Sequence, residues 1–325
     1  MKTFEYVNPG SVDQAVEALS ARDRNRAAVV AGGIDLLGEM KERTFSPERV
    51  VNLKRIPGLG AVEEKAGALR IGALVTLADL AASKTVADRF KGLAQAALSV
   101  ATPQIRNFGT VGGNLCQRPR CWYFRSEDFH CLKKGGNTCF SVEGENRYHA
   151  IFGPGPCHIV HPSDLAPVLL ALGASLSVAG PDGPREIALD RFFRMPHQSM
   201  FTEHALEADE IVTHVNVPAA AAGAKSLYVK FREKKSFDFA ISAVAVAGVV
   251  ESGAIRDARI VLGGVAPVPW RVTKAEAAVN GKRLDEATAK AAADAALEGS
   301  LPMRDNGYKV ALTKTLVRRA LLSLA

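Results

Sequence analysis

The sequence predicts an α+β protein built from two subdomains of mixed strands and helices, followed by a separate C-terminal α+β domain. Short apolar strands alternate with alanine-rich helical patterns up to residue 222. From residue 223 onward, three strand-like runs come first and three helical patterns follow. Strands first and helices afterwards are typical of a domain with its own α+β core. All five cysteines lie within a loop-rich stretch, residues 116–157.

The first predicted subdomain covers residues 1–56. A capping box at Ser11–Gln14 predicts the start of a helix, because its hydroxyl and amide side chains satisfy free backbone amides. An apolar strand at 27–31 then leads through Gly32-Gly33 into a second helical pattern. The apolar run at 50–53 predicts the returning strand.

The second predicted subdomain covers residues 57–222 and contains a cysteine-rich insertion at about 115–158. We expect strands at 69–74, 174–178 and 211–217, and helices at 77–83, 89–100 and 164–172. The C-terminal domain, 223–325, begins after a small-residue linker at 219–223. It is predicted to form a three-stranded antiparallel sheet and a helical bundle, with strands at 226–232, 241–250 and 255–262 and helices at 274–279, 284–298 and 308–324.

Composition excludes several classes of protein. A chain of 325 residues with 47% hydrophobic and 23% charged residues is typical of a soluble globular protein, and no apolar run is long enough to span a bilayer. The N-terminus lacks an apolar signal-peptide region, so we expect a cytoplasmic protein, or a periplasmic one exported with a partner subunit. The net charge of +7 comes from scattered residues, which argues against nucleic-acid binding.

Two glycine turns are candidates for binding a phosphate group. Gly32-Gly33 stands where a strand ends and a helix begins, so consecutive amides and the helix start can face one anion. Such glycine pairs also occur for steric reasons alone. The second turn, Thr110–Asn114, offers a hydroxyl, backbone amides and a side-chain amide. The two turns together predict a clamp on a diphosphate, and neither forms the G-x-G-x-x-G pattern of nicotinamide sites.

Three motifs carry a family resemblance: V-A-G-G-I-D-L-L, Q-I-R-N-F-G-T-V-G-G-N-L and H-P-S-D-L-A. In this order they resemble the FAD-binding middle subunit of molybdenum hydroxylases, a family that includes xanthine dehydrogenase, carbon monoxide dehydrogenase and aldehyde oxidoreductases. The resemblance implies a two-subdomain FAD-binding fold of the PCMH, or vanillyl-alcohol-oxidase-like, type. It implies the following cofactor-binding residues: Val30, Ala31, Gly32, Gly33, Ile34, Asp35, Leu36, Thr110, Gly113, Asn114, Asp164, Ile211 and Lys230.

Three of these residues have a structural alternative. The resemblance implies that Asp164 binds the adenosine ribose, although an acid at this position also fits a helix N-cap. Ile211 matches a position near the flavin and equally fits the core of a strand. Lys230 matches a basic position near the cofactor and equally fits a solvated surface.

The cysteines predict a metal site. They are spaced Cys116-x4-Cys121-x9-Cys131-x7-Cys139-x17-Cys157, without the C-x2-C pairs of common zinc fingers. Four thiolates suit an iron–sulfur cluster or zinc. A zinc site that includes histidine and a set of buried, unligated cysteines are the alternatives. The histidines near the cysteines are His130, His149, His158 and His161.

The stretch Q-R-P-R-C-W-Y-F-R around Cys121 resembles bacterial aldehyde oxidoreductases whose flavin subunit carries an added 4Fe–4S cluster. A related insertion occurs in the flavin subunit of 4-hydroxybenzoyl-CoA reductase. The resemblance implies Cys121, Cys131, Cys139 and Cys157 as cluster ligands and Cys116 as a buried non-ligand. An exchange of Cys116 and Cys121 is the open alternative.

These resemblances imply an FAD and 4Fe–4S electron-transfer subunit of a heterotrimeric molybdenum aldehyde oxidoreductase. A large partner would hold the molybdenum cofactor, a small partner would hold two 2Fe–2S clusters, and an external acceptor would take the electrons. No catalytic residue for the substrate is expected here, since the protein's task is to place and tune the flavin. The alternatives are the flavin subunit of a related aromatic-CoA reductase or xanthine dehydrogenase, a self-sufficient FAD oxidoreductase and a zinc-stabilised binding module.

Overall fold

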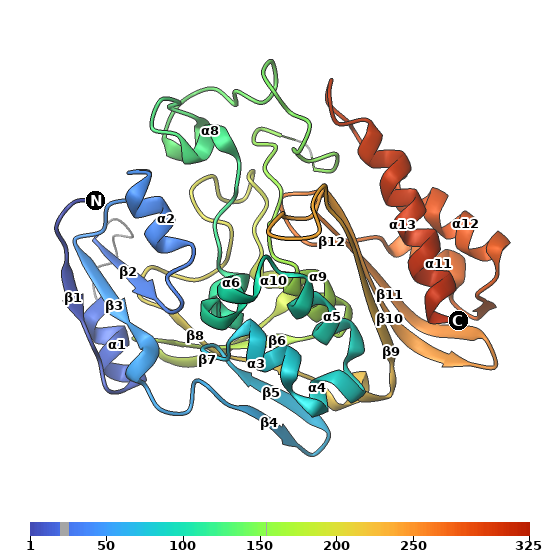
Figure 1. Ribbon diagram of the computed structural model, residues 1–325, viewed down its shortest axis with the longest axis horizontal. Helices are drawn as coiled ribbons and strands as arrows, with labels where there is room; N and C mark the ends of the chain where they lie inside the picture. Colours follow the sequence, from blue (N-terminus) through green and yellow to red (C-terminus); the bar gives the residue numbers. More distant parts are fainter. Residues whose placement is uncertain (20–25, 154) are drawn as a thin grey trace.

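The computed structural model describes residues 1–19, 26–153 and 155–325, so Pro154 of the cysteine-rich insertion lies outside the described residues. Figure 1 shows three sheets that follow one another across the molecule, with the cysteine-rich segment above the central one. The architecture is a mixture of strands and helices with an antiparallel C-terminal sheet, as the sequence predicts.

The N-terminal sheet has three parallel strands in the order β1-β3-β2. The capping box lies at the start of α1, where the Gln14 amide donates to Ser11 Oγ at 3.2 Å. The Gln14 side chain accepts from the Gly10 amide at 2.8 Å, whereas a capping box would use the amide of Ser11. The elements are β1 (Glu5–Val7), α1 (Val12–Leu19), β2 (Ala27–Val30), α2 (Leu36–Lys41), β3 (Arg49–Asn52) and the 3-10 turn η1 (Leu53–Arg55).

The central sheet has five antiparallel strands in the order β4-β5-β8-β6-β7. These strands are β4 (Val62–Lys65), β5 (Ala68–Gly72), β6 (Ser175–Gly180), β7 (Gly183–Ala188) and β8 (Ile211–Val217). The helix expected at 89–100 is divided at Phe90, where α4 ends and α5 begins. The helices are α3 (Leu77–Ala82), α4 (Lys84–Arg89), α5 (Lys91–Ser99), α6 (Pro103–Phe108), α7 (Val111–Leu115), α9 (Leu165–Ala171) and α10 (Leu189–Phe192).

The C-terminal sheet contains the three predicted long strands, extended by two strands of two residues each. It is buried on both faces, because Val244 and Val246 of β10 pack toward the C-terminal helices while Ala243 and Ala245 pack toward the central subdomain. This explains why β10 is almost continuously apolar. The elements are η3 (Ala219–Gly223), β9 (Lys225–Phe231), β10 (Ser242–Glu251), β11 (Ala254–Gly263), β12 (Trp270–Arg271), α11 (Thr273–Val279), β13 (Lys282–Arg283), α12 (Glu286–Ala296) and α13 (Tyr308–Leu324).

The cysteine-rich segment contains little regular structure apart from α8 (Trp122–Arg125) and the 3-10 turn η2 (Leu132–Lys134). Side chains near the start of α13 hold its backbone. Asn306 Nδ2 donates to the carbonyl of His149 at 3.2 Å, and Lys309 Nζ donates to that of Tyr148 at 2.8 Å. The segment is therefore fixed by carbonyl contacts to the C-terminal domain. No helix among the described residues is both long enough and apolar enough to cross a membrane.

Candidate functional site

A cavity of about 1370 Å³ lies between the N-terminal sheet, the second glycine turn, β8 and the cysteine-rich segment. Pockets for small molecules usually measure roughly 300–1,000 Å³, so this cavity has room for an extended dinucleotide. Val30 is buried behind it, against Met40 and Val50. The other twelve predicted cofactor-binding residues all line the cavity: Ala31, Gly32, Gly33, Ile34, Asp35, Leu36, Thr110, Gly113, Asn114, Asp164, Ile211 and Lys230.

The first glycine turn presents unused amide donors to this cavity. Gly33 has a φ of +75°, a conformation that favours glycine. Among the described residues, no backbone or side-chain group accepts a hydrogen bond from the amides of residues 32–35. Four consecutive free amides before the start of α2 form a nest suited to an anion.

The second glycine turn lacks the free backbone amides that the sequence predicts. Thr110 caps the short helix α7, and its hydroxyl accepts from the Gly113 amide at 3.1 Å. The amides of Val111 and Gly112 donate to carbonyls of residues 75 and 73, each at 2.9 Å. These amides are therefore already used, and the glycines of the turn contribute a surface without free donors.

The two turns are in close contact with each other. A β-carbon on Gly32 would overlap the carbonyl oxygen of Phe108, just before the second turn. A β-carbon on Gly112 would lie 2.9 Å from the Ala73 side chain. The first glycine of each pair thus allows close packing against the protein, whereas Gly33 and Gly113 are not blocked by any backbone atom.

Asp164 and Lys230 meet at the cavity as a buried ion pair. Asp164 Oδ2 accepts from Lys230 Nζ at 2.8 Å, and its Oδ1 accepts from the Tyr228 hydroxyl at 2.6 Å. Burial raises the pKa of Tyr228 well above 10, and the neighbouring Asp164 carboxylate adds to this effect. Asp164 makes no side-chain cap bond to α9, where Ser163 Oγ instead accepts from the Ala166 amide at 3.0 Å.

Ile211 is both a core residue and a cavity-lining residue, which are the two roles that the sequence allows. It begins β8 and packs into the core of the first subdomain beside Leu19 and Leu53. It also lines the cavity. Its side chain therefore joins the first subdomain to the wall of the candidate site.

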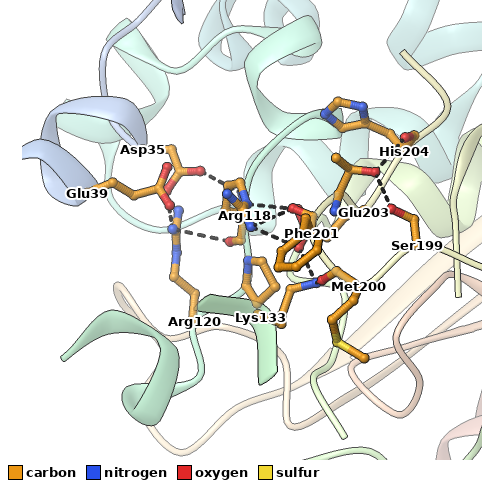
Figure 2. Close-up of polar contacts among 12 residues, drawn as sticks. Asp35, Glu39, Arg118, Arg120, Lys133, Ser199, Met200, Phe201, Glu203 and His204 are labelled. Atoms are coloured by element: carbon orange, nitrogen blue, oxygen red, sulfur yellow. Dashed lines mark hydrogen bonds and ion pairs between the residues drawn. The ribbon is translucent and has the colours of Figure 1, made fainter. Parts of the chain in front are cut away.

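A cluster of charged side chains borders the first turn, and no local sequence pattern indicates its contacts (Figure 2). Asp35 pairs with Arg120 and Arg125, and Glu203 pairs with Arg118 and Lys133. Burial alone would raise the pKa of Asp35, but the guanidinium groups of Arg120 and Arg125 hold it below 3.8. The repeated arginine in Q-R-P-R-C-W-Y-F-R is the sequence signal that points to this cluster.

The four predicted cluster cysteines approach one another. The side chains of Cys139 and Cys157 share a hydrogen bond, which lowers the pKa of Cys139 to about 5 and raises that of Cys157. Burial raises the pKa of Cys121 to about 11, with smaller electrostatic contributions from Cys131 and Cys139. Cys116 was predicted to be buried and is only half-buried: it packs against the core of the second subdomain and lines the large cavity.

All five cysteines are free thiols. Within the described residues, no three His, Cys, Asp or Glu side chains form a group that could hold one metal ion. His149 lies closest to a predicted ligand, with its Nε2 3.3 Å from Cys121 Sγ. In a 4Fe–4S cluster each thiolate binds a different iron, so its four ligands need not converge on one point.

Comparisons with known proteins agree with this fold. Residues 2–220 match the FAD binding domain in molybdopterin dehydrogenase, and residues 226–324 match the CO dehydrogenase flavoprotein C-terminal domain. The chain therefore belongs to the FAD-binding medium subunits of the molybdenum hydroxylase family.

Two curated relatives and one solved structure show how far the similarity extends. The chain is 36% identical to the aldehyde oxidoreductase FAD-binding subunit PaoB of Escherichia coli, over 97% of this chain and 96% of the relative. It is 31% identical to the carbon monoxide dehydrogenase medium chain of Hydrogenophaga pseudoflava, over 98% and 96%. The structure of that dehydrogenase lacking the Mo-pyranopterin moiety matches with a TM-score of 0.79 and 31% identity, over 99% of this chain and 97% of that chain.

Proposed function

We propose that this chain is the FAD- and 4Fe–4S-carrying electron-transfer subunit of a heterotrimeric molybdenum-dependent aldehyde oxidoreductase. The observation that carries the proposal is one cavity lined by twelve of the thirteen expected flavin residues and bordered by the cysteine-rich segment. Similarity to the aldehyde oxidoreductase FAD-binding subunit supports the aldehyde assignment. The partners are a large molybdenum-cofactor subunit and a small subunit with two 2Fe–2S clusters, and the electrons leave to an external acceptor.

The chain's own residues would hold the cofactor from two sides of the cavity. The amides of residues 32–35 bind its pyrophosphate, and the surface of Thr110, Gly113 and Asn114 faces it from α7. Asp164, fixed by Lys230, remains the proposed ribose contact. When bound, FAD supplies the capacity to accept and release electrons, while the protein supplies binding, orientation and electrostatics.

We place the domain boundaries after residues 56 and 222.

The cluster would be held by four thiolates of the cysteine-rich segment: Cys121, Cys131, Cys139 and Cys157. The hydrogen bond between Cys139 and Cys157, and the electrostatic influence of Cys131 and Cys139 on Cys121, support this set. Cys116 lies with the core of the second subdomain and is assigned no iron.

Flavin and iron analysis of the purified complex tests this proposal, with five serine variants measured in parallel. Replacing a thiolate ligand with serine weakens an iron site, because an alkoxide is harder and far less acidic. The Cys121→Ser, Cys131→Ser, Cys139→Ser and Cys157→Ser variants should each lose iron, while Cys116→Ser should keep it. Loss of iron in Cys116→Ser with retention in Cys121→Ser would exchange these two assignments. Wild-type protein with flavin but without iron would exclude the cluster.

A further inference from the structure

The first glycine turn is connected to the cysteine-rich segment through the carboxylate of Asp35. The Arg118 amide donates to Asp35 Oδ2 at 2.6 Å, and Arg125 Nη2 donates to Oδ1 at 2.6 Å. Arg120 Nη1 also donates to Oδ1. We call Asp35, Arg120 and Arg125 the arginine latch.

The cysteine-rich segment is also held by ion pairs with Glu203. Figure 2 shows Arg118 between Asp35 and Glu203. The Arg118 guanidinium lies 2.8 Å from Glu203 Oε2, and Lys133 Nζ lies 2.7 Å from Oε1 of the same residue. Glu203 and Lys133 are both buried, so this second attachment of the cysteine-rich segment lies in the interior of the protein.

Both oxygens of Asp35 already accept hydrogen bonds from the cysteine-rich segment. Its carboxylate is therefore occupied by contacts with the protein, although the amide of Asp35 belongs to the group that faces the cavity. An isolated carboxylate here would repel a phosphate, and the two guanidinium groups offset its charge. The contacts also fix the backbone of Asp35, and with it the direction of the preceding amides.

We propose that Arg120 and Arg125 are positioning residues for the flavin, which hold residues 32–35 in the phosphate-binding conformation through Asp35. The affinity for FAD then depends on side chains of the cysteine-rich segment. This inference rests on the proposed flavin site, because it assigns the phosphate to the amides of that turn.

Dissociation constants for FAD, measured by flavin fluorescence on the complex after removal and re-addition of the cofactor, test the latch. Asp35→Asn and Arg125→Ala should each weaken binding by at least about tenfold, as a loss of 1.4 kcal/mol would. The loss of affinity in the double variant should be smaller than the sum of the two single losses, since both changes break the contact between Asp35 and Arg125. Arg125→Lys, which keeps the charge without the planar fork, should bind with intermediate affinity.

Arg271→Ala is the matched control, because it breaks a two-point ion pair with Glu276 in the C-terminal domain. It should leave the FAD dissociation constant unchanged. If the arginines contacted the phosphate directly, Asp35→Asn would bind FAD as tightly as wild type or more tightly, and the latch would be excluded. If Asp35→Asn or Arg125→Ala fails to fold, the FAD dissociation constant of the milder Arg125→Lys variant decides, since the latch requires it to lie above the wild-type value. Wild-type protein that binds no FAD would instead overturn the proposed function.

Discussion

The two glycine turns have the same Gly-Gly core but different physical roles. In the first, Gly33 turns the chain at a φ of +75°, and the amides of residues 32–35 have no partner among the described residues. In the second, Thr110 and neighbouring carbonyls take up the amides of residues 111–113. The first turn therefore supplies hydrogen-bond donors, and the second supplies a smooth surface. A glycine pair shows where a ligand can approach but not which groups will bind it.

The largest expected effect concerns the contact between the turns. Gly32→Ala places a β-carbon onto the Phe108 carbonyl, which is backbone and cannot rotate away. Overpacking of this kind costs about 1–3 kcal/mol or more, so the variant should unfold at a clearly lower temperature or fail to accumulate. Gly38→Ala in α2 is the control, because a β-carbon there meets nothing within 4 Å. Equal melting temperatures for the two variants would show that the turns do not pack as described.

Glu39, one turn into α2, gives the first glycine turn a pH-dependent neighbour. Burial raises its pKa from 4.5 to about 7, despite the nearby Arg118 and Arg125, and Asp35 and Glu203 add to the rise. Because the folded-state pKa is the higher one, the stabilisation is complete below pH 4.5 and is lost as the pH rises through 7. Glu39→Gln should therefore stabilise the flavin-free protein at pH 8 by up to about 3 kcal/mol.

At pH 5 the stabilisation by Glu39→Gln should fall to about 1 kcal/mol, because folded wild-type protein then carries the proton on Glu39 and the unfolded chain carries it in part. Thermal unfolding of both proteins at the two pH values measures the difference. A stabilisation of equal size at pH 5 and pH 8 would contradict the raised pKa of Glu39.

The two glycines of the second turn should respond differently to substitution, Gly112 in stability and Gly113 in FAD binding. A β-carbon on Gly112 would lie 2.9 Å from that of Ala73, whereas one on Gly113 would meet only Thr110 Oγ1 at 3.1 Å. Gly112→Ala should lower the melting temperature by an amount equivalent to about 1 kcal/mol or more. Gly113→Ala should keep the melting temperature and weaken FAD binding, because its methyl group projects toward the cavity. Unchanged FAD affinity in Gly113→Ala would remove this turn from the cofactor contact.

Periodic patterns in the sequence were sufficient for most of the fold. The C-terminal strands and α13 were predicted because their apolar residues repeat with the period of one buried face or two. The start of α7 was expected as an open turn, since two glycines weaken any helical pattern. There Thr110 and carbonyls of neighbouring elements determine the conformation, and these contacts leave no local signal.

The candidate site was predicted as a set of residues, but not the contacts among them. The sequence placed Asp35 beside a phosphate, and the structure places its carboxylate on arginines 85 and 90 positions away. The ion pair between Asp164 and Lys230 spans 66 positions and likewise depends on tertiary structure. Residue spacing predicts which side chains share one helix, strand or turn. Contacts between side chains of different elements depend on the folded structure.

The FAD content of purified Gly33→Val tests the central claim most directly. Gly281→Val is the matched control, because Gly281 has the same φ of +75° and does not line the cavity. A β-branched residue is strained at a φ of +75° and should rotate the amides of residues 32–35 away from the cavity. Gly33→Val should be flavin-free and Gly281→Val should carry one FAD per chain, measured from flavin absorbance against protein concentration. Stoichiometric FAD in Gly33→Val would contradict the assignment of the pyrophosphate to the first glycine turn.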